Sequence, residues 1–558
     1  NRNYWTLQDT RLTSTQNCVL HQGGDHNSFL RDTFDACLSA GVAIDCAANQ
    51  TTNLLVQDST FNGPGSAIAF GSCAVTNTSQ NAHLIFNRNT YNTGVSSNAA
   101  SISPAIDATF NLLQSKTGTV NVTAGGTTIT CASTCAFSTE FVAGDRVTVN
   151  NGAAGSGEIR EVASTPTDNI TINTISFALG WAATCSACTI QKVITPPYSF
   201  TDLQITNSTF NGINDEDLPG TAASFVVRFA RVPSVDAPND TANPVSGCAA
   251  RNSGIIRGLV ISGNVASNNL GGFYFSDVKG GVVQNNLVTN TNGNSAFSFF
   301  TSTAVAFLSN TIIGVYPLSA SSYFDGSGFD IDICNIGYWA RGNYLQDIPG
   351  SLVSNSESNG QGFAVFASYG TIEANVIVRA RKGIQYGNDE TASATYPGNY
   401  ALNNVIDAAA TDGICMNCQG AAALHQTLVA ANNIITSPAR YGVSRNATAS
   451  SGQSMFTNDI WHPGASAYSN ITAGTGDVAV DPKYRLTGGG AFAYKLQPSS
   501  SLNLSGTAEG SYSDFVGRLF GSRPSIGAFE LDTPSSRAAT PSRPVISSRP
   551  VISSRTVH

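Results

Sequence analysis

The chain has 558 residues, with 28 basic and 36 acidic side chains and a net charge of −8. Charged residues make up 11% of it, well below the roughly 25% of an ordinary globular domain. Without a basic stripe to neutralise phosphates, we do not expect nucleic-acid binding. No apolar run approaches the ~18 residues of a membrane span. The sequence does not open with a secretory signal, so we expect any such signal to have been removed already.

A short motif recurs along the chain, in which an alternating apolar run leads to a small polar residue and then a turn. Twelve polar residues mark its copies: Asp32, Ser59, Asn89, Ser208, Asn264, Asn286, Asn310, Asn343, Asn375, Asn404, Asn433 and Asn458. Apart from gaps of 119 and 56 residues, successive markers are 22 to 33 residues apart. Stretches of four to six alternating residues between turn residues predict strands rather than helices. The repeat therefore predicts a parallel β-solenoid whose marker side chains form hydrogen bonds from coil to coil.

A second strand follows each marker from residue 272 onward. Its alternation predicts one row of side chains that points into the core and one that points outward. The inward row comprises Phe273, Phe275, Phe329, Ile331, Phe363, Val365 and Ile384. The outward row comprises Tyr274, Ser298, Asp330, Ala364, Gln385, Cys415 and Ser444, with Ser276, Phe300, Asp332, Phe366, Gly387 and Asn417 beside it. These outward rows are where we look for chemistry.

The gap of 119 residues contains a different pattern. Between residues 116 and 193, short strands alternate with turn signals every eight to twelve residues, which is typical of a small antiparallel barrel or sandwich. The residues Ala143 to Val147 and Glu161 to Ser164, with Asp168 to Asn173, resemble a small β-module of phage tail and bacterial surface proteins. We expect this module to be inserted into a loop of the solenoid.

The C-terminal segment carries a second resemblance. The runs 481–484, 494–498 and 523–530 resemble the closing coil of secreted right-handed parallel β-helix proteins of the pectate-lyase-like superfamily. Ser500 to Asn503 depart from that ending, and Ser525 stands where Asp is usual. The resemblance implies an exported right-handed parallel β-helix of about twelve or more coils, while the function stays open because this fold serves enzymes, adhesins and passive fibres.

Twelve cysteines in a chain with few charges favour disulfides and an oxidising compartment. Three close pairs stand out, although the connectivity does not follow from sequence. They are Cys131 with Cys135, Cys185 with Cys188, and Cys415 with Cys418. Nine N-glycosylation sequons agree with export: Asn49, Asn77, Asn121, Asn169, Asn207, Asn239, Asn446, Asn470 and Asn503.

One candidate catalytic group is a pair of carboxylates. Asp330 and Asp332 are two strand positions apart, which places them about 7 Å from each other on the outer face. An acid and a base at that separation suit inverting glycoside hydrolysis. Asp389 and Glu390 follow two coils later. Tyr274, Phe300 and Phe366 are candidate sugar-stacking rings and Gln385 a candidate polar contact. The ordinary alternative is that outward acids on a solenoid only aid solubility.

A second candidate group is basic. A polysaccharide lyase needs a base or a charge neutraliser, and Lys279, Arg379, Arg381 and Lys382 are the candidates. The ordinary alternative for Arg381 and Lys382 is an exposed basic pair at a turn. Calcium is the one ligand ion we consider, through Asp325 with Asp330 or through residues 214–217, although neither set has EF-hand spacing. We assign no metal ligands and no cofactor.

The two ends of the chain suggest assembly. The chain enters an alternating strand at once, with Tyr4, Trp5 and Leu7, and no helix covers the first coil. Residues 533–558 repeat every six residues, so in an extended strand the arginines share one face with the valines while the isoleucines occupy the other. The repeat positions are Arg537, Arg543, Val545, Ile546, Arg549, Val551, Ile552 and Arg555. Such a basic strand is suited to an acidic neighbour.

These observations predict an all-β protein in four parts. They are N-terminal β-helix coils (1–115), an inserted β-domain (116–193), the main body with its C-terminal cap (194–532) and an extended tail (533–558). The first functional hypothesis is an extracellular or cell-surface filament subunit that polymerises with copies of itself, end to end, through the first coil and the tail. The alternatives are a secreted polysaccharide lyase or glycoside hydrolase, and a carbohydrate-binding adhesin.

Overall fold

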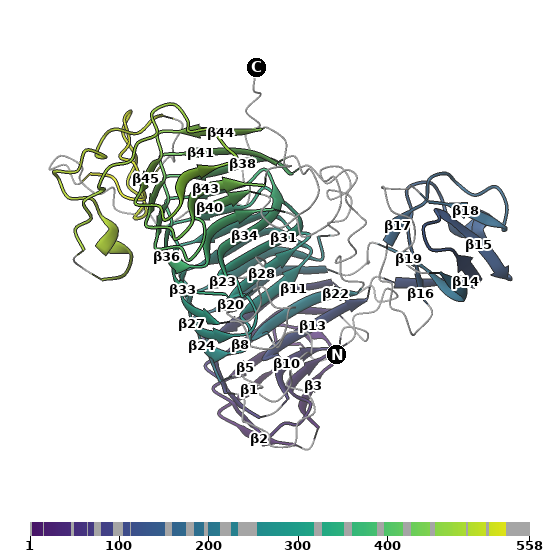
Figure 1. Cartoon of the computed structure of the whole chain (residues 1–558). Helices are drawn as coiled ribbons and strands as arrows, with labels where there is room; N and C mark the ends of the chain where they lie inside the picture. The colour runs from purple at the N-terminus through teal and green to yellow at the C-terminus, as the bar shows by residue number, and fades with distance from the viewer. Residues whose placement is uncertain are drawn as a thin grey trace.

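A computed structural model describes most of the chain (Figure 1). The described residues are 3–14, 16–45, 50–63, 65–71, 80–92, 104–111, 113–150, 159–174, 184–194, 199–212, 225–232, 254–316, 326–350, 360–387, 396–416, 426–446, 452–486, 489–508 and 513–531. The asparagine markers lie where one strand of each coil turns into the next. Three parallel stacks of strands run along the solenoid, so the predicted parallel β-helix is confirmed.

Stack 1 contains the strands that precede each marker. They are β1 (Thr6–Gln8), β5 (Ser28–Leu30), β8 (Thr51–Gln57), β11 (Gln80–Asn87), β20 (Ser199–Thr206), β23 (Ile256–Ser262), β26 (Val278–Gln284), β29 (Thr303–Leu308), β32 (Trp339–Arg341), β35 (Thr371–Glu373), β38 (Tyr396–Leu402), β41 (Gln426–Ala431) and β44 (Gln453–Phe456), with the short β4 (Gly24–Asp25) beside β8.

Stack 2 contains the strands that follow each marker and forms a 13-stranded sheet. They are β2 (Arg11–Thr13), β6 (Thr33–Asp35), β9 (Thr60–Asn62), β12 (Thr90–Asn92), β21 (Thr209–Asn211), β24 (Val265–Asn269), β27 (Leu287–Asn292), β30 (Thr311–Tyr316), β33 (Tyr344–Ile348), β36 (Val376–Ala380), β39 (Val405–Asp407), β42 (Ile434–Thr436) and β45 (Asp459–Trp461).

Stack 3 completes each coil. It contains β3 (Asn17–His21), β7 (Ala40–Ile44), β10 (Ser66–Phe70), β13 (Ile106–Asn111), β22 (Val227–Val232), β25 (Phe273–Ser276), β28 (Phe297–Phe300), β31 (Phe329–Ile336), β34 (Gln361–Ser368), β37 (Lys382–Tyr386), β40 (Ile414–Met416), β43 (Tyr441–Arg445) and β46 (Ser466–Ser469). Strand β31 also pairs with β29 through Ile336 and Thr303, which joins stacks 1 and 3 into one 27-stranded sheet.

The predicted asparagine ladder is present and buried at the turn between stacks 1 and 2. Each side-chain amide donates to the Oδ1 of the next marker over 2.9 to 3.0 Å, from Asn264 through to Asn458. The same Oδ1 atoms also accept the backbone N–H of the preceding marker. Asp32, Ser59, Asn89 and Ser208 extend the pattern through backbone bonds towards the N-terminus. Buried turn amides are satisfied in this way, coil after coil.

Aromatic stacking fills the interior opposite this ladder. The rings of Phe273, Phe297, Phe329 and Phe363 lie one above another on successive stack 3 strands, with centroids 5.1, 5.3 and 4.9 Å apart. Every residue of the predicted inward row is at most 1% exposed. The alternation in the sequence therefore predicts correctly which of these side chains point into the core.

The insertion between β13 and β20 is a separate antiparallel sheet. Its six strands run in the order β17-β16-β19-β14-β15-β18. They are β14 (Leu113–Val122), β15 (Thr128–Ser133), β16 (Arg146–Asn150), β17 (Ile159–Glu161), β18 (Thr171–Asn173) and β19 (Cys185–Val193), with one short helix, α1 (Phe137–Glu140). The sheet has its own apolar core around Phe137, Val147 and Ile190 and protrudes beside the solenoid (Figure 1).

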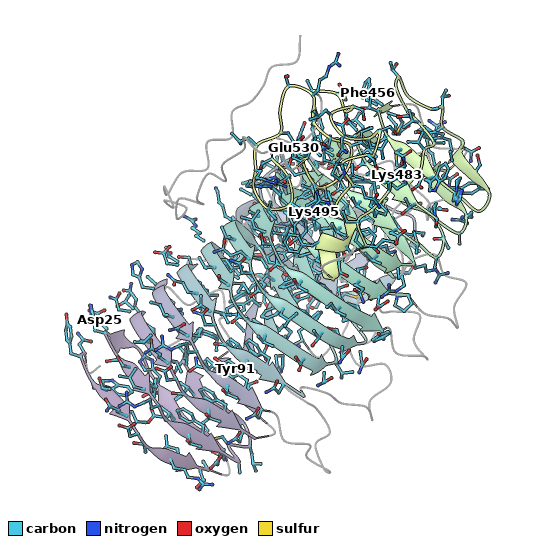
Figure 2. The ribbon with its side chains drawn as sticks, turned by 90° about the vertical axis from the view of Figure 1, so that its left-hand side faces the viewer. Asp25, Tyr91, Phe456, Lys483, Lys495 and Glu530 are labelled. Atoms are coloured by element: carbon cyan, nitrogen blue, oxygen red, sulfur yellow. A yellow bond between two sulfur atoms is a disulfide. The ribbon has the colours of Figure 1, made fainter. Side chains whose placement is uncertain are left out.

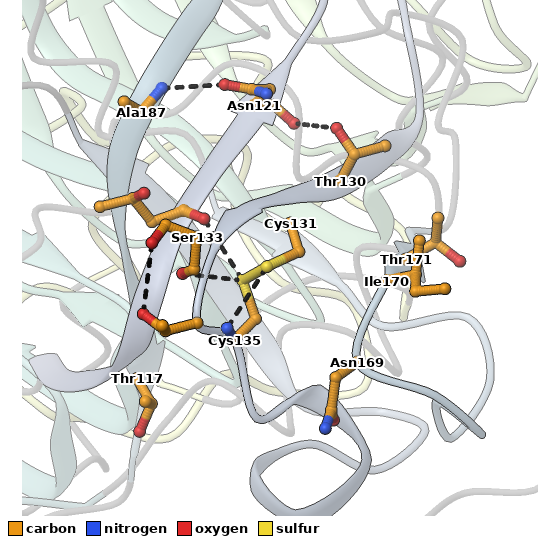
Figure 3. Close-up of a disulfide and its surroundings, with 12 residues drawn as sticks. Thr117, Asn121, Thr130, Cys131, Ser133, Cys135, Asn169, Ile170, Thr171 and Ala187 are labelled. Carbon is orange, nitrogen blue, oxygen red and sulfur yellow. Dashed lines mark hydrogen bonds between the residues drawn. A yellow bond between two sulfur atoms is a disulfide. The ribbon is translucent and has the colours of Figure 1, made fainter.

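Disulfides join Cys131 to Cys135 and Cys185 to Cys188 within this insertion. Figure 3 shows the Cys131–Cys135 bridge, whose Cys135 sulfur lies 3.3 Å from the backbone oxygen of Thr119. A third bridge, Cys18–Cys37, ties the first coil to the second and was not assigned from the sequence. Cys415 is disulfide-bonded, and its predicted partner Cys418 lies outside the described residues.

The C-terminal segment differs from the expected closing coil. Only a short part of it pairs with the last coil, where Thr475 and Val478 bridge to Phe456 and Asp459. The remainder, residues 481–486, 489–508 and 513–531 with the 3₁₀ helix η1 (Gly490–Tyr494), lies across the outer face of stack 2 (Figure 2). Leu496, Leu502, Ile526 and Phe529 pack there against Tyr344, Val376, Val405 and Ile434. We call these three ranges the strap, because they cover apolar side chains that point away from the solenoid interior.

Candidate functional site

The outward row predicted on stack 3 is in register from coil to coil. Tyr274 pairs with Ser298, Ser298 with Asp330, Asp330 with Ala364, and the row continues through Gln385, Cys415 and Ser444. Parallel pairing places these side chains about 4.8 Å apart on one outer face. Candidate residues that are far apart in the sequence therefore share one narrow strip, which we call the stack 3 strip.

Asp330 and Asp332 lie on β31 within this strip. The side chain between them, Ile331, is buried in the core, so both carboxylates project from the outer face. Asp330 is 2% exposed and Asp332 is half-buried. The pairing with β34 shifts register between Ile331 and Asn335, and the Asn335 amide bends back to the carbonyl of Asp332. Such bulges re-aim side chains and are frequent beside active sites.

Two phenyl rings lie one residue beyond the register partners of Ile331. Phe299, Ile331 and Val365 are register partners, and Phe300 and Phe366 follow them on the neighbouring strands, while the register of β31 shifts after Ile331. Phe300 lies 4.9 Å from Tyr274, which in turn lies 4.8 Å from Phe225. Phe300 and Phe366 are buried and Tyr274 is partly exposed. Of the three rings predicted to stack on sugars, only Tyr274 therefore presents surface to solvent.

The basic pair, Arg381 and Lys382, is not the exposed pair at a turn that the ordinary alternative expected. Lys382 begins β37 and is fully buried, while Arg381 is half-buried. The Lys382 ammonium donates to Oε1 of Gln385 at 3.0 Å, and the Gln361 amide donates to the same oxygen at 3.0 Å. Ser327 extends the chain by donating to Gln361 at 2.8 Å. Burying the charge of a lysine is costly, so hydrogen bonds to the ammonium such as this one are needed to hold it inside the fold.

A third charged group was not singled out from the sequence. Asp412 is fully buried and accepts two hydrogen bonds from Arg440, at 2.8 and 2.7 Å, and one from Ser444 at 2.7 Å. Gly383 and Gly413 are stacked, so Asp412 occupies in its coil the position that Lys382 occupies in the coil before. Aligning the segments RKGIQY and TDGICM would have revealed this pair as a buried cation followed by a buried anion.

Several predicted residues lie outside the described part of the chain. They are Asp389, Glu390, Asp325, residues 214–217 and every tail position from Arg537 to Arg555. Among the described residues, no group of three or more His, Cys, Asp or Glu side chains could hold a metal ion. The same residues include no helix long and apolar enough to cross a membrane. The calcium and tail hypotheses remain predictions.

The N-terminal assembly candidates lie on the first described coil. Tyr4 is 73% exposed and its ring stacks on His26, while Trp5 and Leu7 are half-buried against the end of the core. Strand β1, which contains Leu7, pairs with β5. These contacts describe how the first coil is held, and a polymer contact there remains a prediction.

Comparison with known proteins gives likeness in fold only. No protein-family profile and no curated protein sequence matches the chain. Among solved structures, the catalytic domain of a GH87 α-1,3-glucanase in complex with nigerose is similar over 85% of this chain, at 12% identity and a TM-score of 0.34. The A-module of the Azotobacter vinelandii mannuronan C-5 epimerase AlgE4 is similar over 85% of this chain and 91% of its own length, at 10% identity and a TM-score of 0.28.

A third similar structure is the Gp54 tailspike of Acinetobacter baumannii bacteriophage AP22 in complex with the capsular saccharide. It shares 11% identity over 77% of this chain and 69% of its own, with a TM-score of 0.20. The chain spans 64% of the length of the glucanase domain. The strand pairing by itself establishes the architecture: this chain has a parallel β-helix fold.

Proposed function

We propose that this chain is an extracellular polysaccharide-acting protein, and specifically a glycoside hydrolase whose acid and base are Asp330 and Asp332. The observation that carries the proposal is the pair of outward carboxylates on β31, placed at a register shift and flanked by rows of aromatic side chains. Positions two residues apart on a regular strand are about 7 Å from each other, which is the order of separation that inverting hydrolysis requires, where a water molecule must fit between base and sugar.

Burial distinguishes the two carboxylates. The half-buried Asp332 can reach a water molecule and suits the base. Asp330 is 2% exposed, so to act as the acid it needs the leaving oxygen to contact the small part of its side chain that reaches the surface. Disulfides agree with an oxidising, extracellular setting. We prefer this function to a filament subunit because the strand register gathers its candidate residues on one face of the solenoid.

The test is turnover by the full chain on a panel of neutral and uronic polysaccharides, measured as new reducing ends. Asp330→Asn and Asp332→Asn should each lower kcat by at least ~10²-fold, with folding unchanged, because general acid or base catalysis supplies about that much. Asp107→Asn is the matched control, since Asp107 lies on the outer face of stack 3 but pairs with Arg228, away from the bulge. Wild-type turnover that survives both substitutions would reject the assignment.

A polysaccharide lyase is the second candidate, and buried Lys382 is the observation that favours it. A lyase needs a base and a neutraliser of the uronate carboxylate. Lys382 is bonded to Gln385 of the strip, and Arg440 is paired with Asp412, which accepts a bond from Ser444 of the strip. The same screen separates the two, because a lyase leaves an unsaturated uronate that absorbs in the ultraviolet. Activity lost in Lys382→Met but retained in Asp330→Asn and Asp332→Asn would favour the lyase.

A further inference from the structure

A second aromatic surface lies on the outer face of stack 1, away from the stack 3 strip. Trp339, on β32, is 39% exposed, and Tyr400, on β38, is 38% exposed. Both pair in register with Thr371 of the strand between them. Their side chains therefore project from the same face two coils apart, which corresponds to about 10 Å at the spacing of parallel strands.

A third ring lies beside them. Tyr369 is 52% exposed and has a left-handed backbone, with φ of 54°. Its ring rests on the backbone of Gly398, where a Cβ atom would come within 2.6 Å of Tyr369 Cδ1. Gly398 is two residues before Tyr400 on β38, so Tyr369 lies against the same strand that carries Tyr400. We call Trp339, Tyr369 and Tyr400 the aromatic platform.

The platform is fixed rather than loosely exposed. The indole N–H of Trp339 donates to Oε1 of Glu373 at 2.8 Å, and Glu373 is 6% exposed. The Arg341 guanidinium lies 6.0 Å from the Trp339 ring centroid and is itself anchored by a 3.0 Å bond to the carbonyl of Asp514 in the strap. Holding a ring in place before a ligand arrives lowers the entropy lost on binding.

The charges beside Trp339 are paired. Arg341 and Glu373 are register partners on adjacent strands and face each other, and Asp514, which also acts on Arg341, forms an ion pair with Arg518. An exposed aromatic surface without net charge complements a ligand that is flat, partly apolar and uncharged. The faces of pyranose rings in a neutral polysaccharide have that character, and two ring positions about 10 Å apart would engage separate sugar units of one extended chain.

We propose that the aromatic platform is a binding site for a neutral polysaccharide, separate from the stack 3 strip and independent of its chemistry. Sugar units would stack on Trp339 and Tyr400, with Tyr369 at the side. The platform would hold the chain on a polymeric substrate or surface. It would therefore contribute to interaction with long glycans and contribute little to reactions of short oligosaccharides.

The test is affinity gel electrophoresis of the full chain through gels that contain a neutral glucan, a xylan or a mannan, with a uronic-acid polymer as the charged comparison. At least one neutral polymer should retard the wild type, and Trp339→Ala and Tyr400→Ala should each weaken that retardation at least fivefold. Trp339→Phe should retain most of it, because a flat ring remains. Tyr316→Ala is the matched control, since Tyr316 is 42% exposed on stack 2 and its ring lies over Gly314.

The outcomes also separate this site from the proposed catalytic one. Retardation that is unchanged in Asp330→Asn and Asp332→Asn, but lost in Trp339→Ala, supports the platform whether or not the chain is a hydrolase. Retardation lost in the aspartate variants but kept in folded Trp339→Ala and Tyr400→Ala proteins overturns the platform and leaves the strip as the binding site. Retardation by the uronic-acid polymer alone, or by none of the polymers, also overturns it.

Discussion

The side-chain amide of Asn343 donates to Oδ1 of Asn375 over 2.9 Å, across one coil of the solenoid. The same amide donates to the carbonyl of Phe307 at 2.9 Å, and Oδ1 of Asn343 accepts two bonds from Asn310. One side chain thus satisfies polar groups of three successive coils. This relationship repeats along the solenoid and explains why asparagine recurs at one phase of the sequence.

We predict that Asn343→Ala lowers the free energy of unfolding by about 3 kcal/mol, because several buried polar groups lose their partner at once. Chemical denaturation followed by circular dichroism measures the loss. Asn290→Gly is the control, since Asn290 is exposed, its amide makes one 3.2 Å bond to Asn268, and glycine keeps its left-handed backbone with φ of 53°. An equal loss in both variants would contradict a special role for the ladder.

The residue just before each marker has a left-handed backbone. Introducing glycine at this position should therefore stabilise the protein, and removing glycine from it should destabilise the protein. Ser309 is exposed with φ of 53°, and Gly342 takes the same place one coil later with φ of 65°. Ser309→Gly should stabilise the protein by about 0.5–1 kcal/mol, because glycine tolerates this conformation best. Gly342→Ala should cost about 1 kcal/mol or more, since its Cβ would come within 3.0 Å of the Phe515 carbonyl. Thermal unfolding of both variants checks the signs.

The Asn432 side chain binds the strap, so removing it should make the strap more accessible to amide exchange and to proteases. Its amide donates to the carbonyl of Thr507 at 2.9 Å, its Oδ1 accepts the Thr507 N–H at 2.9 Å, and its backbone oxygen accepts the N–H of Gly527 at 2.7 Å. Asn432→Gly keeps the left-handed backbone, with φ of 55°, and removes only the side-chain bonds. We predict faster amide exchange and proteolysis around residues 500–508 and 513–531. In the coils, the variant loses the bond that Thr457 Oγ1 donates to Asn432 Oδ1, so any change there should be confined to that turn. If the strap is protected equally in Asn432→Gly and in the wild type, apolar packing alone holds it.

Asp459 should make the last coil sensitive to pH. It is fully buried, and burial raises its pKa from 3.8 to about 7, although one oxygen accepts the Val480 N–H at 2.9 Å. A raised pKa means that the folded state binds the proton more tightly than the unfolded chain, so stability falls as pH rises from about 4 to 7. Asp459→Asn should remove this slope and stabilise the protein above pH 7, by at most about 4 kcal/mol.

The measurement is the unfolding midpoint of wild type and Asp459→Asn between pH 4 and pH 8. Asp481→Asn is the control, because Asp481 is exposed nearby and accepts a backbone bond from Lys483. A wild-type midpoint that rises through this range, or a variant whose slope matches the wild type, would reject the role of Asp459.

The sequence alone determined the repeat, the phase of its alternation and the rows of outward side chains. These features depend on local rules: a strand alternates every two residues, and a ladder requires a polar residue at one fixed position. The inward positions of Phe273 and Phe329 and the ladder position of Asn343 therefore follow from the repeat pattern itself. Burial of Lys382 was not predicted, because its setting depends on Gln361 and Gln385, which approach it only when the coils stack.

Only the tertiary structure decided the contacts that join distant segments. The strap could be recognised as a terminal motif, yet its position across stack 2 depends on apolar side chains such as Val405 and Ile434 that face away from the interior. Alternation shows that such residues point outward and does not say what covers them. Trp339, Glu373 and Tyr400 likewise form one surface only because three coils are stacked in register, and stacking distance is set by backbone hydrogen bonds between coils rather than by sequence separation.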